Sequence, residues 1–96
     1  MSEGIVYLIT TPTLSADNWY KVGITQDLTK RLGTYQTASP NRNFFVVHSI
    51  KHPNIELAEK KIQENMKFFA FQRKKEWFQI PLHMAISRLD DQLGAE

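Results

Sequence analysis

The sequence predicts an α+β fold in which a small three-stranded antiparallel sheet is flanked by helices. Apolar runs rich in β-branched residues recur along the chain, as is typical of strands, and other segments repeat apolar residues at helical spacing. The first two apolar runs are separated by only eight residues, which favours an antiparallel hairpin over a parallel crossover.

The expected strands follow from composition. Gly4–Thr10 is apolar without a breaker and predicts a strand covered on both faces. Thr11–Asn18 carries proline, serine, aspartate and asparagine, which predict a turn. Trp19–Ile24 is expected to form the second strand and Phe44–Ile50 the third, with a short extra strand near residues 76–80.

The expected helices follow from capping residues and spacing. Asp27 is placed to cap a first helix, which ends before Pro40. A second helix begins after Pro53 and carries a continuous apolar stripe. That stripe consists of Ile55, Ala58, Ile62, Met66 and Phe69. A closing helix is expected at about residues 82–94, so that one domain covers residues 1–96.

Composition excludes several classes of protein. The 96 residues include no cysteine, which excludes disulfide scaffolds, cysteine zinc sites and thiol nucleophiles. No apolar run approaches the ~20 residues that span a bilayer, and the start, Met-Ser-Glu-Gly, lacks the basic lead-in of a secretory signal. We therefore expect an intracellular protein with no membrane partner, in the cytoplasm, or in the nucleus if the source is eukaryotic or viral.

Positive charge is concentrated between Lys51 and Lys75, although the whole chain has a net charge of only +2. Such a cluster attracts phosphate backbones, and a solvated helix face explains it equally well. The candidate DNA contacts are Lys60, Lys67, Arg73, Lys74 and Lys75.

Two charged residues lie beside apolar helix faces. At about 100° per residue, Glu59 lies about 60° from the centre of the second helix's stripe, whereas Glu56 and Glu64 point further away. A carboxylate at the edge of a core needs a basic partner or a metal ion. Arg31 lies beside the apolar face of the first helix. A structural ion pair between Arg31 and Glu59 is one interpretation, and a shared functional site is the other.

Tyr7 and Tyr20 would lie on neighbouring strands of the hairpin. A tyrosine in an apolar strand usually belongs to the core, with its hydroxyl bonded to a backbone carbonyl, and this is the alternative to a functional role for each. Gly23 stands inside the second strand, where glycine often marks a bend or a close backbone approach.

Taken together, these segments resemble the GIY-YIG nuclease domain. The matching segments are Gly4-Ile5-Val6-Tyr7, Tyr20-Lys21-Val22-Gly23, Arg31, Glu59 and a closing Glu76-Trp77-Phe78. The closing motif resembles the small branch found in phage, large-virus and bacterial proteins. The resemblance covers a motif-bearing core at about residues 4–80, and it implies a GIY-YIG-like three-stranded sheet flanked by helices, as predicted above.

The resemblance also implies roles for these residues. Tyr7 corresponds to a general base or water-orienting group, and Tyr20 to a tyrosine that positions the attacking water or the phosphate. Arg31 corresponds to the arginine that neutralises the phosphate, and Glu59 to the carboxylate that holds one Mg²⁺ or Mn²⁺ ion. Gly23 and Gln63 would support the site, and Gln63 stands where this branch often has histidine.

The expected function is a divalent-metal-dependent endonuclease that hydrolyses DNA phosphodiester bonds. Its intrinsic sequence specificity should be low, because a chain of this size has no separate recognition domain. A homodimer or a protein partner would then have to supply the specificity. One alternative is a catalytically inactive module that binds DNA or protein. Another is an RNA-binding α/β module that stacks bases on Phe44, Phe45 and Trp77.

Overall fold

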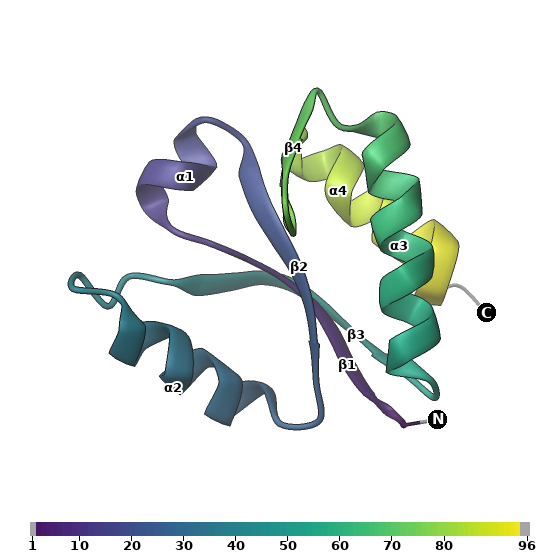
Figure 1. Cartoon of the computed structure of the whole chain (residues 1–96), viewed down its shortest axis with the longest axis horizontal. Helices are drawn as coiled ribbons and strands as arrows, with labels where there is room; N and C mark the ends of the chain where they lie inside the picture. The colour runs from purple at the N-terminus through teal and green to yellow at the C-terminus, as the bar shows by residue number, and fades with distance from the viewer. Residues whose placement is uncertain (1, 95–96) are drawn as a thin grey trace.

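A five-stranded sheet with helices on both sides forms the architecture of the computed structural model, which describes residues 2–94 (Figure 1). The elements are β1 (Gly4–Thr10), α1 (Pro12–Ala16), β2 (Trp19–Thr25), α2 (Leu28–Ala38), β3 (Phe45–His52), α3 (Ile55–Phe69), β4 (Gln72–Lys74), β5 (Trp77–Gln79), α4 (Leu82–Leu89) and the π-helical η1 (Asp90–Gly94). The predicted α+β class is confirmed.

The strand order is β3-β1-β2-β5-β4, and each neighbouring pair is antiparallel. The predicted hairpin of β1 and β2 is present, and it pairs Tyr7 with Gly23. The three expected strands are therefore neighbours in the sheet. The prediction of three strands with one short extra strand is too low by one, because both β5 and β4 extend the sheet beyond β2.

One local prediction is wrong, and two further segments add detail that the sequence did not predict. The segment Thr11–Asn18 contains the short helix α1, because the hydroxyl of Thr11 caps it and Pro12 occupies a first-turn position. The basic segment that starts at Arg73 lies partly in β4, because it pairs with β5 along the sheet edge. The closing helix is α-helical only to Leu89 and continues as η1 to Gly94.

The helices begin where their capping residues predict. The side chain of Asp27 accepts a hydrogen bond from the backbone of Lys30 at the start of α2, and that of Asn54 accepts one from Leu57 at the start of α3. Among the described residues 2–94, no helix has the length and apolar character needed to cross a bilayer.

The two faces of the sheet are covered differently. In Figure 1, α2 lies on one side of the sheet, and α3 with α4 lies on the other. The hydrophobic core fills the space between the sheet, α3 and α4, and its largest contributors include Leu8, Ile62, Met66, Phe78 and Leu89. Phe69, the last member of the predicted stripe, is 37% exposed. No residue of α2 is fully buried, although Leu32 and Tyr35 are half-buried.

Candidate functional site

Strand alternation decides which side chains gather beneath α2. Side chains on a strand point alternately to opposite faces, and directly paired residues of neighbouring strands share a face. Tyr7 pairs with Gly23, so Lys21, two residues earlier on β2, lies on the same face. We call this the α2 face of the sheet.

Tyr20 does not reach the α2 face, and the expectation that it meets Tyr7 is corrected. It lies on the opposite face in the hydrophobic core, where only 4% of it is exposed. The position beside Tyr7 belongs to Lys21, which the sequence analysis missed. The available signal was Gly23, because a residue two positions away from it must share its face.

Gly23 provides the space that the Tyr7 ring occupies. A Cβ atom at position 23 would collide with the Oη and Cζ atoms of Tyr7. Tyr7 is completely buried, so its ring has no room to move aside. Gly23 therefore marks a close approach, as its position inside a strand predicts.

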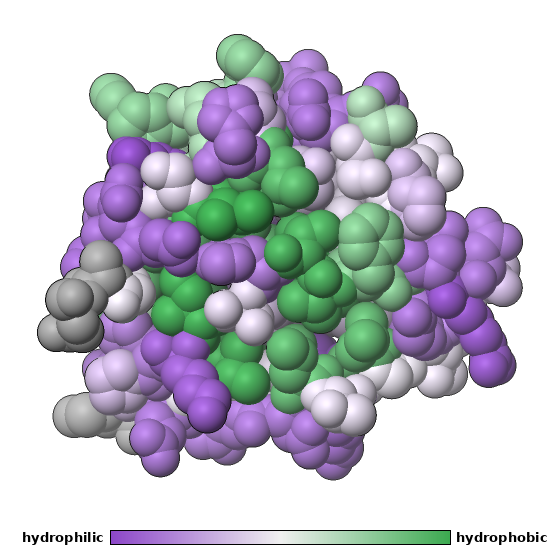
Figure 2. Space-filling model, turned by 180° about the vertical axis from the view of Figure 1, so that it is seen from behind, coloured by the Kyte–Doolittle hydropathy of each residue, from purple (hydrophilic) through white to green (hydrophobic). Residues whose placement is uncertain are grey.

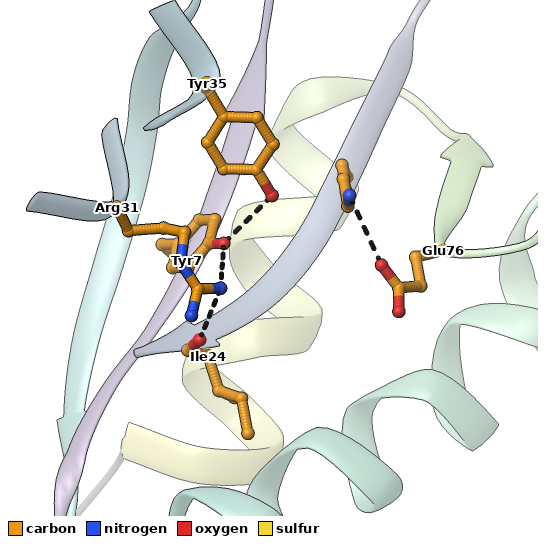
Figure 3. A network of polar contacts seen from close by, with 6 residues as sticks. Tyr7, Ile24, Arg31, Tyr35 and Glu76 are labelled. Atoms are coloured by element: carbon orange, nitrogen blue, oxygen red, sulfur yellow. Dashed lines mark hydrogen bonds and ion pairs between the residues drawn. The ribbon is translucent and has the colours of Figure 1, made fainter. Parts of the chain in front are cut away.

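A hydrogen-bonded network connects Tyr7 with two side chains of α2 (Figure 3). The Oη atoms of Tyr7 and Tyr35 are 3.0 Å apart. Arg31 donates from Nη1 to Tyr7 Oη at 3.5 Å and to the backbone oxygen of Ile24 at 3.2 Å. Because Tyr7 Oη accepts from Arg31, its own hydrogen can be donated to Tyr35. The hydroxyl hydrogen of Tyr35 then remains available for an outside acceptor.

Lys21 connects this network to an acidic residue and an aromatic row. Its Nζ lies 3.3 Å from Glu76 Oε1 and 5.1 Å from the centroid of the Tyr35 ring. Trp77 is the cross-strand partner of Lys21. Phe44 lies between Trp77 and Tyr35, with ring centroids 6.5 Å and 5.1 Å away. An ammonium, a carboxylate and three aromatic rings thus adjoin the Arg31 network.

Glu59 is half-buried on α3, as the helical spacing predicts, whereas Glu64 is exposed. Partial burial raises the pKa of Glu59, and repulsion by Glu76 raises it further, while the positive charge of Arg31 lowers it. Glu59 therefore belongs electrostatically to the same group of charges. Among residues 2–94 no ion pair joins Glu59 to Arg31, so the interpretation of the two as a structural ion pair is wrong. Gln63, one turn further along α3, is also half-buried.

We define the polar cluster as Tyr7, Lys21, Arg31, Tyr35 and Glu76, together with Glu59 of α3, which is linked to the others by charge and makes no hydrogen bond or ion pair with them among residues 2–94. Burial, together with the hydrogen bond that Tyr7 donates to Tyr35, raises the pKa of the Tyr7 hydroxyl well above its ordinary value, although Arg31 acts in the opposite direction. A phenol of this kind holds its proton at neutral pH. The environment of Tyr7 therefore suits a positioning role better than that of a general base.

The carboxylates of the polar cluster suit a magnesium ion. Mg²⁺ usually takes one or two carboxylates from a protein, keeps several waters and accepts phosphate oxygens as further ligands. Glu76 contributes to the raised pKa of Glu59, and a cation near both carboxylates would relieve that repulsion. The described part of the chain contains no group of three or more His, Cys, Asp or Glu residues that could hold a metal. Within that part, Glu59 and Glu76 are two carboxylates whose charges repel each other.

The five predicted DNA contacts are all exposed, and they are Lys60 and Lys67 on α3, Arg73 and Lys74 on β4, and Lys75 in the following turn. The two strand residues among them point to different faces of the sheet. Lys74 pairs with Trp77 and so lies on the α2 face, whereas Arg73 pairs with Phe78 and lies on the other. Only Lys74 therefore shares a sheet face with the polar cluster.

The fold and the polar cluster define a small α+β domain with cationic and hydroxyl side chains on one face of its sheet. The chain belongs to the T5orf172 domain family, whose model matches residues 4–91. This match corrects the resemblance to GIY-YIG nucleases, because the T5orf172 domain is a distinct family. No curated protein and no solved structure matches the chain.

Proposed function

We propose that this protein hydrolyses phosphodiester bonds in intracellular DNA with one divalent cation, Mg²⁺ or Mn²⁺. The observation that carries the proposal is the polar cluster, where the Arg31 guanidinium and the Lys21–Glu76 pair lie around Tyr7 and Tyr35, and where the charges of Arg31 and Glu76 act on the half-buried Glu59. Phosphodiester hydrolysis requires counter-charge for the phosphate and an anchor for a cation. The family description names no reaction, so the proposal rests on this site.

Arg31 is the principal phosphate-binding group in this proposal. Its Nη1 is held by Tyr7 and by the carbonyl of Ile24, which fixes the plane of the guanidinium. Its Nε and Nη2 atoms donate to no acceptor among residues 2–94, so they are available to two oxygens of one phosphate. The Tyr35 hydroxyl offers a further donor beside them.

Glu59 would hold the cation, with Glu76 as a second donor. When bound, the cation supplies Lewis-acid chemistry and lowers the pKa of a coordinated water. Glu59 must be ionised for this role, and the positive charges of Arg31 and Lys21 favour that form. Tyr7, on β1 of the sheet, keeps Arg31 and Tyr35 in position, because its hydroxyl contacts both.

A second candidate is a module that binds DNA and cuts nothing. The environment of Tyr7 favours it, because a buried phenol with a raised pKa is a poor proton acceptor at neutral pH. The polar cluster would then bind a phosphate without activating water. The two candidates differ only in turnover, so a cleavage assay separates them.

The test is to incubate purified protein with supercoiled plasmid and Mg²⁺ or Mn²⁺, with EDTA as the metal-free control. Arg31→Ala and Glu59→Gln should each reduce nicking by roughly a hundredfold or more. The matched controls are Arg42→Ala and Glu64→Gln, both at exposed positions outside the polar cluster, and both should retain activity. Equal cutting by all variants indicates a contaminating nuclease, and DNA binding without cutting supports the second candidate.

A further inference from the structure

A separate hollow lies beside the polar cluster on the α2 face. It is lined by Leu14, Trp19, Lys74 and Trp77 and has a volume of about 360 Å³. Trp19 and Lys21 are two residues apart on β2, Lys21 pairs with Trp77, and Trp77 pairs with Lys74. Strand register thus places the hollow and the polar cluster on the same face of the sheet. We call this hollow the tryptophan pocket.

The walls of the tryptophan pocket suit a flat aromatic ring that belongs to an anion. Two indole rings provide stacking surfaces of the kind that nucleobases prefer, and Leu14 adds an apolar wall. Lys74 adds a positive charge at the edge strand, and it makes no ion pair within residues 2–94. A nucleotide combines both features, a stacking ring and a negative phosphate.

Trp77 is the wall of the tryptophan pocket that lies next to the polar cluster. It follows Glu76 directly in the chain and faces Lys21 across the strand pair. Facing residues in an antiparallel pair have Cβ atoms about 4.5–5.5 Å apart. A base in the pocket would therefore place its sugar-phosphate backbone next to Lys21 and the groups that surround it.

We propose that the tryptophan pocket receives one unpaired nucleobase beside the phosphate that the polar cluster binds. This inference rests on the proposed function and specifies its substrate class. A base inside a continuous duplex is stacked on both sides, so it can enter such a pocket only from a single strand, a bulge or a flipped position. The favoured substrate is DNA with an unpaired nucleotide at the cleavage position.

The two tryptophans of the chain both line this pocket, so intrinsic fluorescence reports its occupancy. The protein is titrated in EDTA with a short duplex that contains one unpaired thymine and with the fully matched duplex. The unpaired thymine should change the fluorescence and improve affinity by roughly fivefold or more, as base stacking on an aromatic side chain does.

Two pairs of variants test whether the pocket causes this preference. Leu14→Glu fills the pocket with a charge, and Thr13→Glu makes the same charge change at an exposed neighbour in α1. Leu14→Glu should abolish the preference and Thr13→Glu should keep it. Lys74→Ala should also reduce the preference. Arg73→Ala, on the other face of the sheet, should lower the affinity for both duplexes by the same factor. Circular dichroism of each variant checks that it folds.

Equal affinity of the wild-type protein for the two duplexes would overturn the proposal. The proposal would also be overturned if both variants of each pair lost the preference for the unpaired thymine equally. The titration involves neither a cation nor cleavage, so its failure leaves the plasmid result untouched. Conversely, a fluorescence response without cleavage of the thymine-containing duplex in Mg²⁺ would reject the nuclease function and retain the base-binding pocket.

Discussion

The contact between Tyr7 and Gly23 determines where the polar cluster can form. Because position 23 has no side chain, the Tyr7 ring lies flat across β2 and brings its hydroxyl to Arg31 and Tyr35. Tyr7 is fully buried, so it acts as a fixed support for these two exposed or half-exposed side chains. A substitution at either residue should therefore affect both stability and the site.

Gly23→Ala should destabilise the fold by about 1–3 kcal/mol, because the added Cβ collides with a ring that has no room to move. Gly33→Ala is the matched control. Its Cβ meets nothing within 4 Å, and alanine favours the helix by about 1 kcal/mol, so it should stabilise the protein. Urea denaturation measures both, and equal midpoints for the two variants would contradict this account.

Glu59→Gln should stabilise the protein at neutral pH. In the folded protein the pKa of Glu59 lies above its ordinary value of 4.5, chiefly because of partial burial and secondly because of Glu76. The folded state therefore binds this proton more tightly than the unfolded state does. The resulting stability is fully present below 4.5 and is lost as the pH rises through the folded pKa.

The glutamine variant does not lose this stability as the pH rises. It should therefore be more stable than the wild type near neutral pH, and the difference should vanish near pH 4. The gain should stay below about 1 kcal/mol, because much of the side chain is exposed to solvent. Thermal unfolding across this pH range measures it. The exposed Glu64→Gln variant should follow the wild type, and a wild-type advantage over Glu59→Gln at neutral pH would reject the argument.

Helical spacing was sufficient to place Glu59 at the edge of the core, because the orientation of a helical side chain depends on its own helix. The face of Tyr20 could not be deduced in the same way, because it depends on the register between two strands. Glu76 could be assigned to the site only after the β5 pairing was known, since that pairing brings it to Lys21. Contacts between distant segments were the part that the sequence alone did not reveal.

At the scale of elements, α2 and α3 are held by different forces. Four residues of α3 are buried in the core, whereas none of α2 is. The side chain of Gln36 instead exchanges two hydrogen bonds with the backbone of Phe44, at 2.8 Å and 3.0 Å. Helices with few buried contacts open at low free energy. The helix that carries Arg31 and Tyr35 should thus be the more mobile of the two.

Gln36→Ala should loosen α2 and reduce activity together. The substitution leaves both backbone groups of Phe44 without their partner, which typically costs about 1–3 kcal/mol when such groups are shielded from water. Hydrogen exchange should accelerate in α2 and remain unchanged in α3. Thr34→Ala, which removes a hydrogen bond only within α2, is the control, and equal exchange in both variants would contradict the proposed clamp.

The expected elements that proved right were those with many residues of one pattern, such as β1, β2 and α3. Two short elements were missed, although the three-residue β5 was expected. Helix α1 has five residues and β4 has three, so neither has enough residues to show a period. Their stability comes from a cap at Thr11 and from pairing with β5. Such elements depend on the fold around them, which local propensity does not encode.

At the scale of the whole molecule, the apolar and basic surfaces are unevenly distributed. Figure 2 shows the side opposite to the view of Figure 1, where apolar residues gather in the middle and hydrophilic residues surround them. An apolar area offers nothing to a phosphate backbone. The DNA backbone is therefore expected to follow the polar cluster and the basic edge at β4, where Arg73, Lys74 and Lys75 are exposed.

DNA affinity should fall steeply with salt and depend little on sequence. Each phosphate contact contributes about −0.9 to the slope of log affinity against log salt. Replacing Arg73, Lys74 and Lys75 together with alanine should therefore reduce the slope by roughly two to three, and equally for unrelated duplex sequences, because phosphate contacts carry no base information. Lys51→Ala, on β3 at the opposite edge of the sheet, should leave the slope unchanged. Fluorescence anisotropy over a salt series measures these slopes, and an unaltered slope in the triple variant would exclude the β4 edge as the DNA-binding surface.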